Sequence, residues 1–288
     1  MSEPGSIAES PPDDSTFADL SDWRTIQVSG SEALPWLDDL ISADVHDLPP
    51  GRARPSLLLS PTGGVLASFT VVMAEPGAVL IQDPAQPRPV DRLLTPYVLT
   101  SDVHLRDTTG DVLVIAFPDE SDAPEVPRAI RFAPSVLGSG AGILVAAKDR
   151  ADLATMIAGS LRRLTDEEIE VERISAGIVR VGVDTSEGDL PQETGLMGWV
   201  SFEKGCYLGQ EAVARVSNGG HPRRLVLPVE SQDVLTAGED VLAGGETVGA
   251  ITSAARHGGR TLAFARIGWD RRDADLMSPR GVALRRRS

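Results

Sequence analysis

The chain has one cysteine, Cys206, within the sequence Lys-Gly-Cys-Tyr-Leu-Gly-Gln-Glu that begins at Lys204. Glycines at Gly205 and Gly209 leave the thiol with little steric cover and permit a tight turn. A free thiol at its ordinary pKa is only about 3% thiolate at pH 7, and a neighbouring lysine, or a helix beginning near Gly209, raises that fraction. The segment therefore predicts a reactive thiol, with burial as a small apolar side chain as the alternative interpretation.

Other familiar kinds of cysteine chemistry need partners that the sequence does not supply. The histidines His46, His104, His221 and His257 lie outside any segment that resembles a cysteine protease, although His221 follows the thiol by fifteen residues. A single cysteine cannot form an internal disulfide or supply the thiolates of an ordinary zinc or iron–sulfur site. We therefore predict no resident metal, and cluster chemistry at Cys206 would require another protein.

Composition and charge restrict the class of protein. A chain of 288 residues with 41% apolar residues can bury the cores of two or three domains. A net charge of −15 repels phosphate backbones, so we predict no direct binding of nucleic acid, and we interpret the basic run at residues 285–287 as a solvated end. Neither a membrane span nor a secretory leader is visible. We therefore expect a cytoplasmic protein that does not bind membranes, and we take a monomer as the default.

The first half of the chain must position this motif with mixed α and β elements. Residues 1–16 are rich in Ser, Pro, Glu and Asp and predict a disordered leader. An N-terminal α+β lobe is expected over residues 17–122, ending in an acidic, Pro-containing loop at 119–129. Its expected elements are a helix capped by Ser31, a hairpin of strands 56–60 and 65–73 turning at 61–64, a strand at 79–82, a helix at 90–97 broken by Pro96, and strands at 103–105 and 112–116.

The second half changes character twice. A second α+β lobe over 123–221 is expected to hold a strand at 143–146, a helix with Leu153, Ile157, Leu161 and Leu164 on one face, and a helix that starts after Thr165. Residues 177–198 are rich in Gly and acids, which is typical of backbone that contacts a ligand. Short β-rich runs separated by Gly-rich turns then predict a small β-barrel over 222–288.

The cysteine motif, followed by Val213-Ala214-Arg215, resembles the signature of the YgfZ family of folate-binding proteins, which are related to the glycine-cleavage T-protein and implicated in iron–sulfur cluster assembly or repair. The segments LDDLISADV, LLLSPTGGVLASFTV, HPRRLVLPV and VGAITSAARH extend the resemblance from Phe17 to Leu284. It implies an α+β fold like that of the T-protein. Two α+β, ferredoxin-like lobes would surround a central cavity that holds tetrahydrofolate, and a C-terminal antiparallel β-barrel would follow.

One position separates this chain from the T-proteins that it resembles. Their hairpin reads Gly-Gly-x-x-Asp-Asp, and the first aspartate sits at the reacting folate nitrogen during aminomethyl transfer. Here Gly63 and Gly64 are followed by Val-Leu-Ala-Ser, which places Ala67 at that point. A methyl group can neither exchange a proton nor stabilise a developing cation. Because the T-proteins also lack the cysteine, the resemblance disfavours aminomethyltransferase activity.

Folate binding, as the resemblance implies it, requires a carboxylate and a cation. A reduced pterin presents a row of N–H donors that a carboxylate accepts well, and Glu193 is the first candidate, with Asp184 second. The glutamate tail of folate calls for an arginine. The further candidate contacts are Arg180, Arg215, Arg223 or Arg224 for the tail, Tyr207 for ring stacking, and Gln210 and Glu211, which would line the cavity or cap a helix.

Three hypotheses follow. The first is a tetrahydrofolate-binding accessory protein of iron–sulfur cluster assembly or repair, in which Cys206 is the functional thiol with Lys204 beside it. Its partners would be assembly or client proteins, and it would indirectly support cluster enzymes such as those that thiolate tRNA. The alternative is a folate-dependent aminomethyl or one-carbon transferase like the T-protein. The third hypothesis is an interaction module with an empty cavity, which folate titration would distinguish from the other two.

Overall fold

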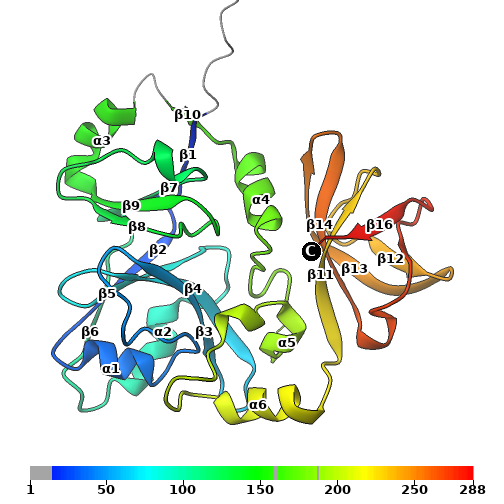
Figure 1. Ribbon diagram of the computed structural model, residues 1–288, viewed down its shortest axis with the longest axis horizontal. Coiled ribbons are helices and arrows are strands. Elements are labelled where there is room, and N and C mark those ends of the chain that lie inside the picture. The colour runs from blue at the N-terminus through cyan, green and yellow to red at the C-terminus, as the bar shows by residue number, and fades with distance from the viewer. Residues whose placement is uncertain (1–14, 158–160, 187, 288) are drawn as a thin grey trace, which may run out of the picture.

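A computed structural model describes residues 15–157, 161–186 and 188–287, so most of the predicted leader over 1–16 lies outside the described residues. Figure 1 shows two sheets stacked on each other, with a barrel beside them and helices between the two parts. The described helices are α1 (Ala33–Asp38), α2 (Val90–Leu94), α3 (Arg150–Ile157), α4 (Asp166–Ser175), α5 (Pro191–Thr194) and α6 (Gln210–Gly219). The strands of the two sheets are β1 (Thr16–Asp19), β2 (Arg24–Ser29), β3 (Ala53–Leu59), β4 (Val65–Met73), β5 (Ala78–Gln82), β6 (His104–Asp107), β7 (Val112–Phe117), β8 (Ile130–Phe132), β9 (Ala141–Ala146) and β10 (Arg162–Arg163).

The first sheet has the strand order β3-β4-β5-β2-β6, and each of its neighbouring pairs is antiparallel. The predicted hairpin is confirmed, because β3 and β4 pair with Leu58 opposite Ala67 and are joined by the turn at residues 60–64. Helices α1 and α2 cover one face, where Leu37, Leu80 and Leu94 belong to one buried apolar cluster. This cluster fixes the hairpin against the helices and leaves the hairpin tip free to contact the rest of the chain.

The second sheet has the order β10-β1-β7-β9-β8 and draws on distant parts of the chain. Strand β1 pairs in parallel with β10 and antiparallel with β7, so the first described strand completes a sheet built mainly from residues after 112. The two sheets share a buried layer that includes Val72, Val114 and Leu144. The lobe boundary predicted at residue 122 falls between β7 and β8 of this one sheet.

Several local elements differ from the expected ones. Glu32 rather than Ser31 precedes α1, and the Ser31 hydroxyl donates to Asp102 at 2.6 Å instead of capping the helix. The helix expected to reach Leu164 is described from Arg150 to Ile157, residues 158–160 lie outside the described residues, and Leu161 and Leu164 flank the short edge strand β10. Both differences arise because a distant partner competes with the local pattern. The start predicted at Thr165 is confirmed, since Thr165 and Glu168 form a capping box on α4.

The C-terminal part is a closed antiparallel barrel in the order β11-β14-β13-β12-β15-β16. Its strands are β11 (Arg224–Ser231), β12 (Asp240–Ala243), β13 (Glu246–His257), β14 (Arg260–Gly268), β15 (Leu276–Met277) and β16 (Ala283–Arg286). Closure removes the exposed sheet edges that short strands would otherwise leave. The chain therefore combines two β-sheets covered by α-helices with a closed C-terminal barrel, and the predicted α+β fold class is confirmed.

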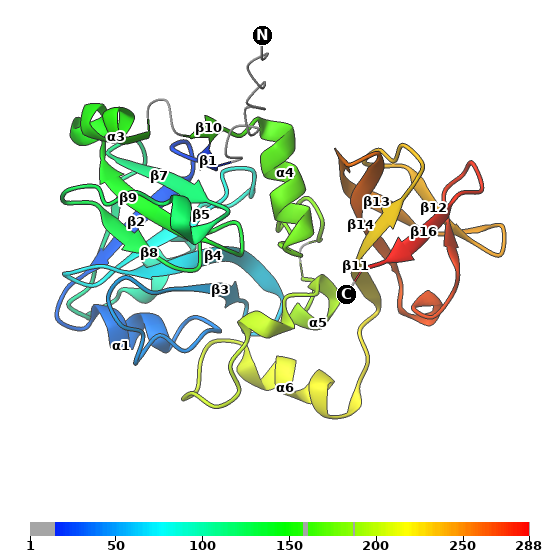
Figure 2. The same ribbon diagram turned by 45° about the horizontal axis from the view of Figure 1, so that its top comes forward.

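Helices α4 and α5 lie between the sheets and the barrel, as both ribbon views show (Figure 2). A buried cluster joins all of these parts, with Leu59 from the hairpin, Ile174 from α4, Tyr207 from the cysteine motif and Phe264 from the barrel. The cysteine motif is therefore packed where the three parts of the molecule meet. No helix among the described residues has the length and apolar character needed to cross a membrane.

Candidate functional site

The cysteine motif forms a loop that leads into α6, and Lys204 anchors its first half. The Lys204 ammonium pairs with the Asp38 carboxylate at 2.9 Å and donates to the carbonyl oxygens of Ile41 at 3.1 Å and Ala43 at 2.9 Å. It also contacts the Asp38 carbonyl, and its side chain is only 2% exposed. Burial lowers the pKa of Lys204 below its ordinary value, and the charge of Asp38 opposes part of that shift. Lys204 therefore ties the loop to the segment between α1 and β3.

Tyr207 anchors the other side of the loop. Its ring is buried in the central apolar cluster, and the Lys204 ammonium lies 5.4 Å from the ring centroid. The phenol oxygen is buried and has no hydrogen-bond partner among the described residues. Burial raises the pKa of Tyr207 to about 12. Ring stacking on a ligand, the role predicted from sequence, would require this ring to leave the cluster.

Cys206 lies between these two anchored side chains, and it is exposed. The neighbouring Gly205 has open space where a Cβ would be. The thiol is thus held outward by fixed neighbours rather than sealed in apolar packing. The Lys204 ammonium contacts oxygen atoms of α1 and of the segment between α1 and β3. These contacts fix the position of the loop that carries the thiol.

Helix α6 begins directly after the motif. Gly209 precedes it with a φ of +81°, and Gln210 and Glu211 form its first turn, where an acidic side chain is favourable. Gln210 is half-buried and Glu211 is exposed. Arg215, a predicted contact for the folate tail, is exposed on the same helix. These side chains therefore lie on α6, and none of them lines the recess described below.

Three glycines bring the hairpin tip, the motif and the loop before α5 into close contact. A Cβ on Gly209 would lie 2.4 Å from the Ser60 carbonyl oxygen, and one on Gly64 would lie 2.9 Å from Gly188. The Val65 amide donates to the Asp189 carbonyl at 2.9 Å across the same junction. The Gly-Gly turn of the hairpin is therefore a packing surface for two other segments.

Asp184, the second candidate for the pterin, is fully engaged inside the protein. One carboxylate oxygen accepts from the hydroxyls of Thr252 at 2.7 Å and Ser253 at 2.6 Å. The other accepts from the Arg173 guanidinium at 2.9 Å and the Arg180 amide at 2.8 Å. The side chain is completely buried. Asp184 therefore connects α4 and the turn after it to strand β13 of the barrel.

This carboxylate ends a chain of ion pairs that crosses the molecule. Asp83, just after β5, accepts from Arg180 at 2.6 Å, and Arg180 pairs with Glu170 at 3.3 Å. Glu170 in turn binds Arg173, which pairs with Asp184. Burial opposes the charge of Arg173, yet Glu170 and Asp184 hold its pKa above the ordinary value. The chain links the first sheet, α4 and the barrel.

Glu193, the first candidate, has three backbone donors. It accepts from the Leu190 amide at 2.9 Å in the first turn of α5, and from the amides of Arg223 at 2.9 Å and Arg224 at 3.3 Å. Its side chain is buried. In this conformation Glu193 fastens the segment between α6 and the barrel to α5, a role that the loop-like sequence around it did not indicate.

A narrow recess with a cavity volume of about 30 Å³, partly open to solvent, lies between the first sheet and the turn after α4. Its lining includes the aromatic residues Trp23 and Trp199, and Asp83 and Arg180 supply charge. Of the predicted folate contacts, Arg180 lines this recess, whereas Cys206, Asp184 and Glu193 do not. Sequence reasoning missed Asp83, although an acid directly after a buried strand was a visible signal.

Ala67, the position that the resemblance sets against the T-protein aspartate, faces away from this recess. Ala67 is fully buried in the cluster beneath α1 and α2, while the next residue, Ser68, lines the recess. Neither side chain has a carboxylate. Within the described residues, no group of three or more His, Cys, Asp or Glu side chains is placed to hold a metal ion.

Comparisons with known proteins agree with this architecture. Residues 13–118 match the family described as the GCVT N-terminal domain. The aminomethyltransferase of Thermotoga petrophila is 24% identical over 82% of this chain and 72% of its own length. The mitochondrial iron-sulfur cluster assembly factor IBA57 homolog of Mycosarcoma maydis is 28% identical over 71% of this chain and 54% of its own.

The solved structure of glycine cleavage system aminomethyltransferase T from Bartonella henselae matches with a TM-score of 0.78 at 19% identity, covering 96% of this chain and 86% of that one. The chain therefore has the fold of the glycine-cleavage aminomethyltransferases, and it is similar in sequence both to enzymes of that name and to an iron–sulfur cluster assembly factor.

Proposed function

We propose that this protein is a cytoplasmic, YgfZ-like, tetrahydrofolate-binding accessory protein of iron–sulfur cluster assembly or repair. The observation that carries the proposal is the exposed thiol of Cys206, held outward between the anchors Lys204 and Tyr207. Similarity to a relative named as an iron–sulfur cluster assembly factor supports the same reading. An exposed thiol can exchange with a partner, but alone it cannot hold a cluster.

The recess beside the first sheet is our candidate for the pterin ring, which would enter it as the lining side chains move apart, because the cavity volume is only about 30 Å³. Its aromatic walls suit a flat heterocycle, and Asp83 offers a carboxylate at its edge. Each Asp83 oxygen accepts one donor, from Ala85 and from Arg180, which leaves a further lone pair on each. Asp184 has four donors already, so the ring would have to displace internal partners there.

Titration of tetrahydrofolate into the protein tests this site, with tryptophan fluorescence as the readout because Trp23 and Trp199 line the recess. We expect saturable quenching that Asp83→Asn weakens about tenfold. Asp107→Asn is a matched control, since Asp107 also accepts an amide two residues ahead but is exposed on β6. Equal affinity in both variants would remove Asp83 from the site, and no saturable quenching would favour an interaction module.

The role of the thiol is tested separately in a strain whose iron–sulfur enzymes, including tRNA-thiolating ones, have lost activity for want of this protein. We expect rescue by the wild type and none by Cys206→Ser. Labelling of the native protein with a thiol reagent should be complete without denaturant, because Cys206 is exposed. Equal rescue by Cys206→Ser would remove the thiol from the mechanism.

The alternative function is aminomethyl or one-carbon transfer, which the names of several similar proteins support. The residues at the hairpin oppose it, because Ser68, which lines the recess, has no carboxylate to offer the folate nitrogen, and Ala67 is buried on the other face of the strand. Purified protein with tetrahydrofolate and an aminomethyl donor should therefore form no methylenetetrahydrofolate. Sustained turnover would favour the transferase.

A further inference from the structure

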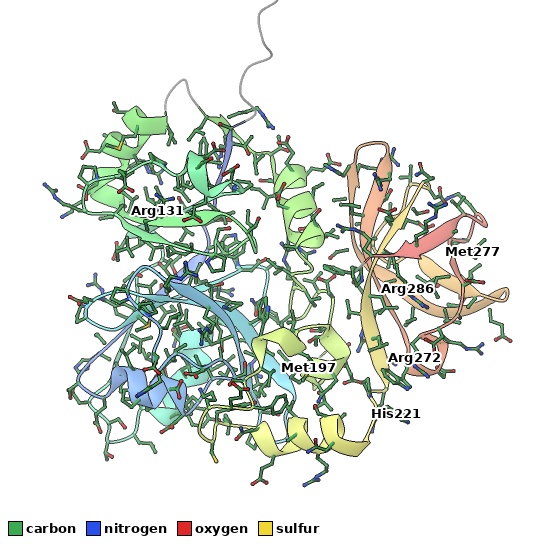
Figure 3. The ribbon with its side chains drawn as sticks, in the orientation of Figure 1. Arg131, Met197, His221, Arg272, Met277 and Arg286 are labelled. Atoms are coloured by element: carbon green, nitrogen blue, oxygen red, sulfur yellow. The ribbon has the colours of Figure 1, made fainter. Side chains whose placement is uncertain are left out.

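A second cavity, with a volume of about 710 Å³ and partly open to solvent, lies between α6 and the barrel. Its lining shares no residue with the recess beside the first sheet. The segment from His221 to Arg224, which joins α6 to β11, forms one wall (Figure 3). The charged and ionisable lining residues are His221, Arg223, Arg224, Arg266, Asp189 and Glu193.

Internal donors already satisfy the two carboxylates of this cavity. Glu193 accepts the three backbone N–H groups described above. Asp189 accepts from the Arg266 guanidinium at 2.8 and 2.6 Å and from the Ser186 amide at 2.8 Å. Glu187, next to Ser186, lies outside the described residues. The carboxylates of Asp189 and Glu193 are therefore occupied by donors of the protein, and they hold the residues that line the cavity in place.

The three arginines of this cavity, unlike its two carboxylates, are only partly engaged by the protein. The side chains of Arg223 and Arg224 are exposed at the cavity, while Glu193 and the Trp269 amide, which donates to the Arg223 carbonyl at 3.0 Å, fix their backbone. Arg266 is 15% exposed, and its Nε is buried without a hydrogen-bond partner among the described residues. Three arginines in one cavity stand out in a chain with a net charge of −15.

The His221 ring adds a fourth basic group at the rim. It stacks on Trp269 with the ring centroids 5.8 Å apart and an angle of 6° between the ring planes. This contact holds the ring at the point where the chain enters the barrel (Figure 3). Fixed backbone and two exposed guanidinium groups, beside the Arg266 guanidinium that Asp189 holds, give a cavity that is preorganised for negatively charged groups.

We propose that this cavity binds a small oligoanion, a molecule that carries at least two carboxylate or phosphate groups, independently of folate in the recess. Arg223 and Arg224 would each bind one group through paired N–H donors. A γ-linked glutamate chain and a phosphorylated metabolite are two sources of this chemistry.

Calorimetric titration of the full chain in 150 mM NaCl tests the proposal with two probes, pyrophosphate and tri-γ-glutamate peptide. We expect one of them to bind saturably, which also identifies the source of the anion. The double variant Arg223→Gln/Arg224→Gln should weaken that binding at least about tenfold. Arg285→Gln/Arg286→Gln, an exposed arginine pair on β16, is the matched control and should leave it unchanged.

Binding of neither probe would overturn the proposal, as would equal weakening by the control pair, because that result would reflect overall charge alone. Of the arginines expected to contact the folate tail, only Arg180 lines the recess, so tetrahydrofolate quenching should be the same in the Arg223/Arg224 double variant as in the wild type. A failure of the oligoanion site can therefore be told apart from a failure of the proposed folate site.

Discussion

Gly209 lies directly against Ser60, so that a Cβ on Gly209 would stand 2.4 Å from the Ser60 carbonyl oxygen. Gly209 also has a φ of +81°, a conformation that other L-residues rarely adopt. The glycine of the cysteine motif thus lets α6 start beside the hairpin tip. A side chain at position 209 would therefore cause both backbone strain and a steric clash with Ser60.

Gly209→Ala should therefore lower the free energy of unfolding by at least about 2 kcal/mol, measured by urea denaturation. Gly205→Ala, in the same loop, is the matched control, because no atom lies within 4 Å of its Cβ position. We expect the control to stay within about 0.5 kcal/mol of the wild type. Equal effects in the two variants would show that the contact with Ser60 does not limit this position.

Asp184→Asn should destabilise the protein by about 3 kcal/mol, because it removes the charge that faces the buried Arg173 guanidinium. Asp111→Asn is a suitable comparison, since Asp111 pairs with Arg106 at 3.3 Å on the surface, and it should cost less than about 1 kcal/mol. Denaturant unfolding measures both. Limited proteolysis between α6 and β11 should also speed up in Asp184→Asn, because Asp184 holds β13 to the turn after α4. Similar losses in the two variants would contradict a special role for the buried pair.

Features set by neighbouring residues could be predicted from the sequence. The β3–β4 hairpin follows from two β-rich runs around a Pro-Thr-Gly-Gly turn, and the start of α4 follows from the capping pattern of Thr165 and Glu168. The barrel follows from short strands at regular spacing. In each of these cases the local preference and the final structure agree.

Features set by distant partners could not be predicted in this way. The pairing of β1 with β10 joins residues about 146 positions apart, and nothing local to either strand indicates the other. Asp184 and Glu193 have the residue type that a pterin needs, yet donors from β13 and from the segment before β11 occupy them. Lys204 likewise has the right type to activate a thiol, but its ammonium binds oxygen atoms near α1.

The capping box of α4 predicts a pH dependence of stability. The side-chain hydrogen bond from Arg162, followed by that from the Thr165 amide, lowers the pKa of Glu168 from 4.5 to about 2. A carboxyl group whose folded pKa is depressed contributes stability above its unfolded pKa, and this contribution is lost as the pH falls toward its folded pKa. Glu168→Gln should therefore be less stable than the wild type by about 1 kcal/mol at pH 7.

That difference should narrow as the pH falls from about 4.5 toward 2, and urea unfolding at a series of pH values measures it. Glu167→Gln, at the exposed neighbouring position, is the control and should show a smaller change over the same interval. A Glu168→Gln difference that stays constant down to pH 2.5 would mean that the carboxylate has no preferential contacts in the folded protein.

Lys204 offers the sharpest test of how the thiol is presented, because the only other lysine of the chain, Lys148, is exposed. Lys204→Met keeps the apolar stem but removes the ammonium, which leaves the Asp38 carboxylate without its ion-pair partner and the carbonyls of Ile41 and Ala43 without this donor. We expect a loss of about 2 to 4 kcal/mol in the free energy of unfolding and almost none for Lys148→Met.

Hydrogen exchange separates an anchoring role from a general loss of stability. In Lys204→Met the amides of residues 203–207 should exchange faster under native conditions, while those of β14 should exchange as in the wild type at temperatures well below the unfolding transition. Cys206 is unchanged in Lys204→Met. Reduced rescue of iron–sulfur enzymes by this variant would therefore show that function depends on where the loop holds the thiol. Full rescue together with faster exchange would mean that an exposed thiol suffices wherever the loop holds it.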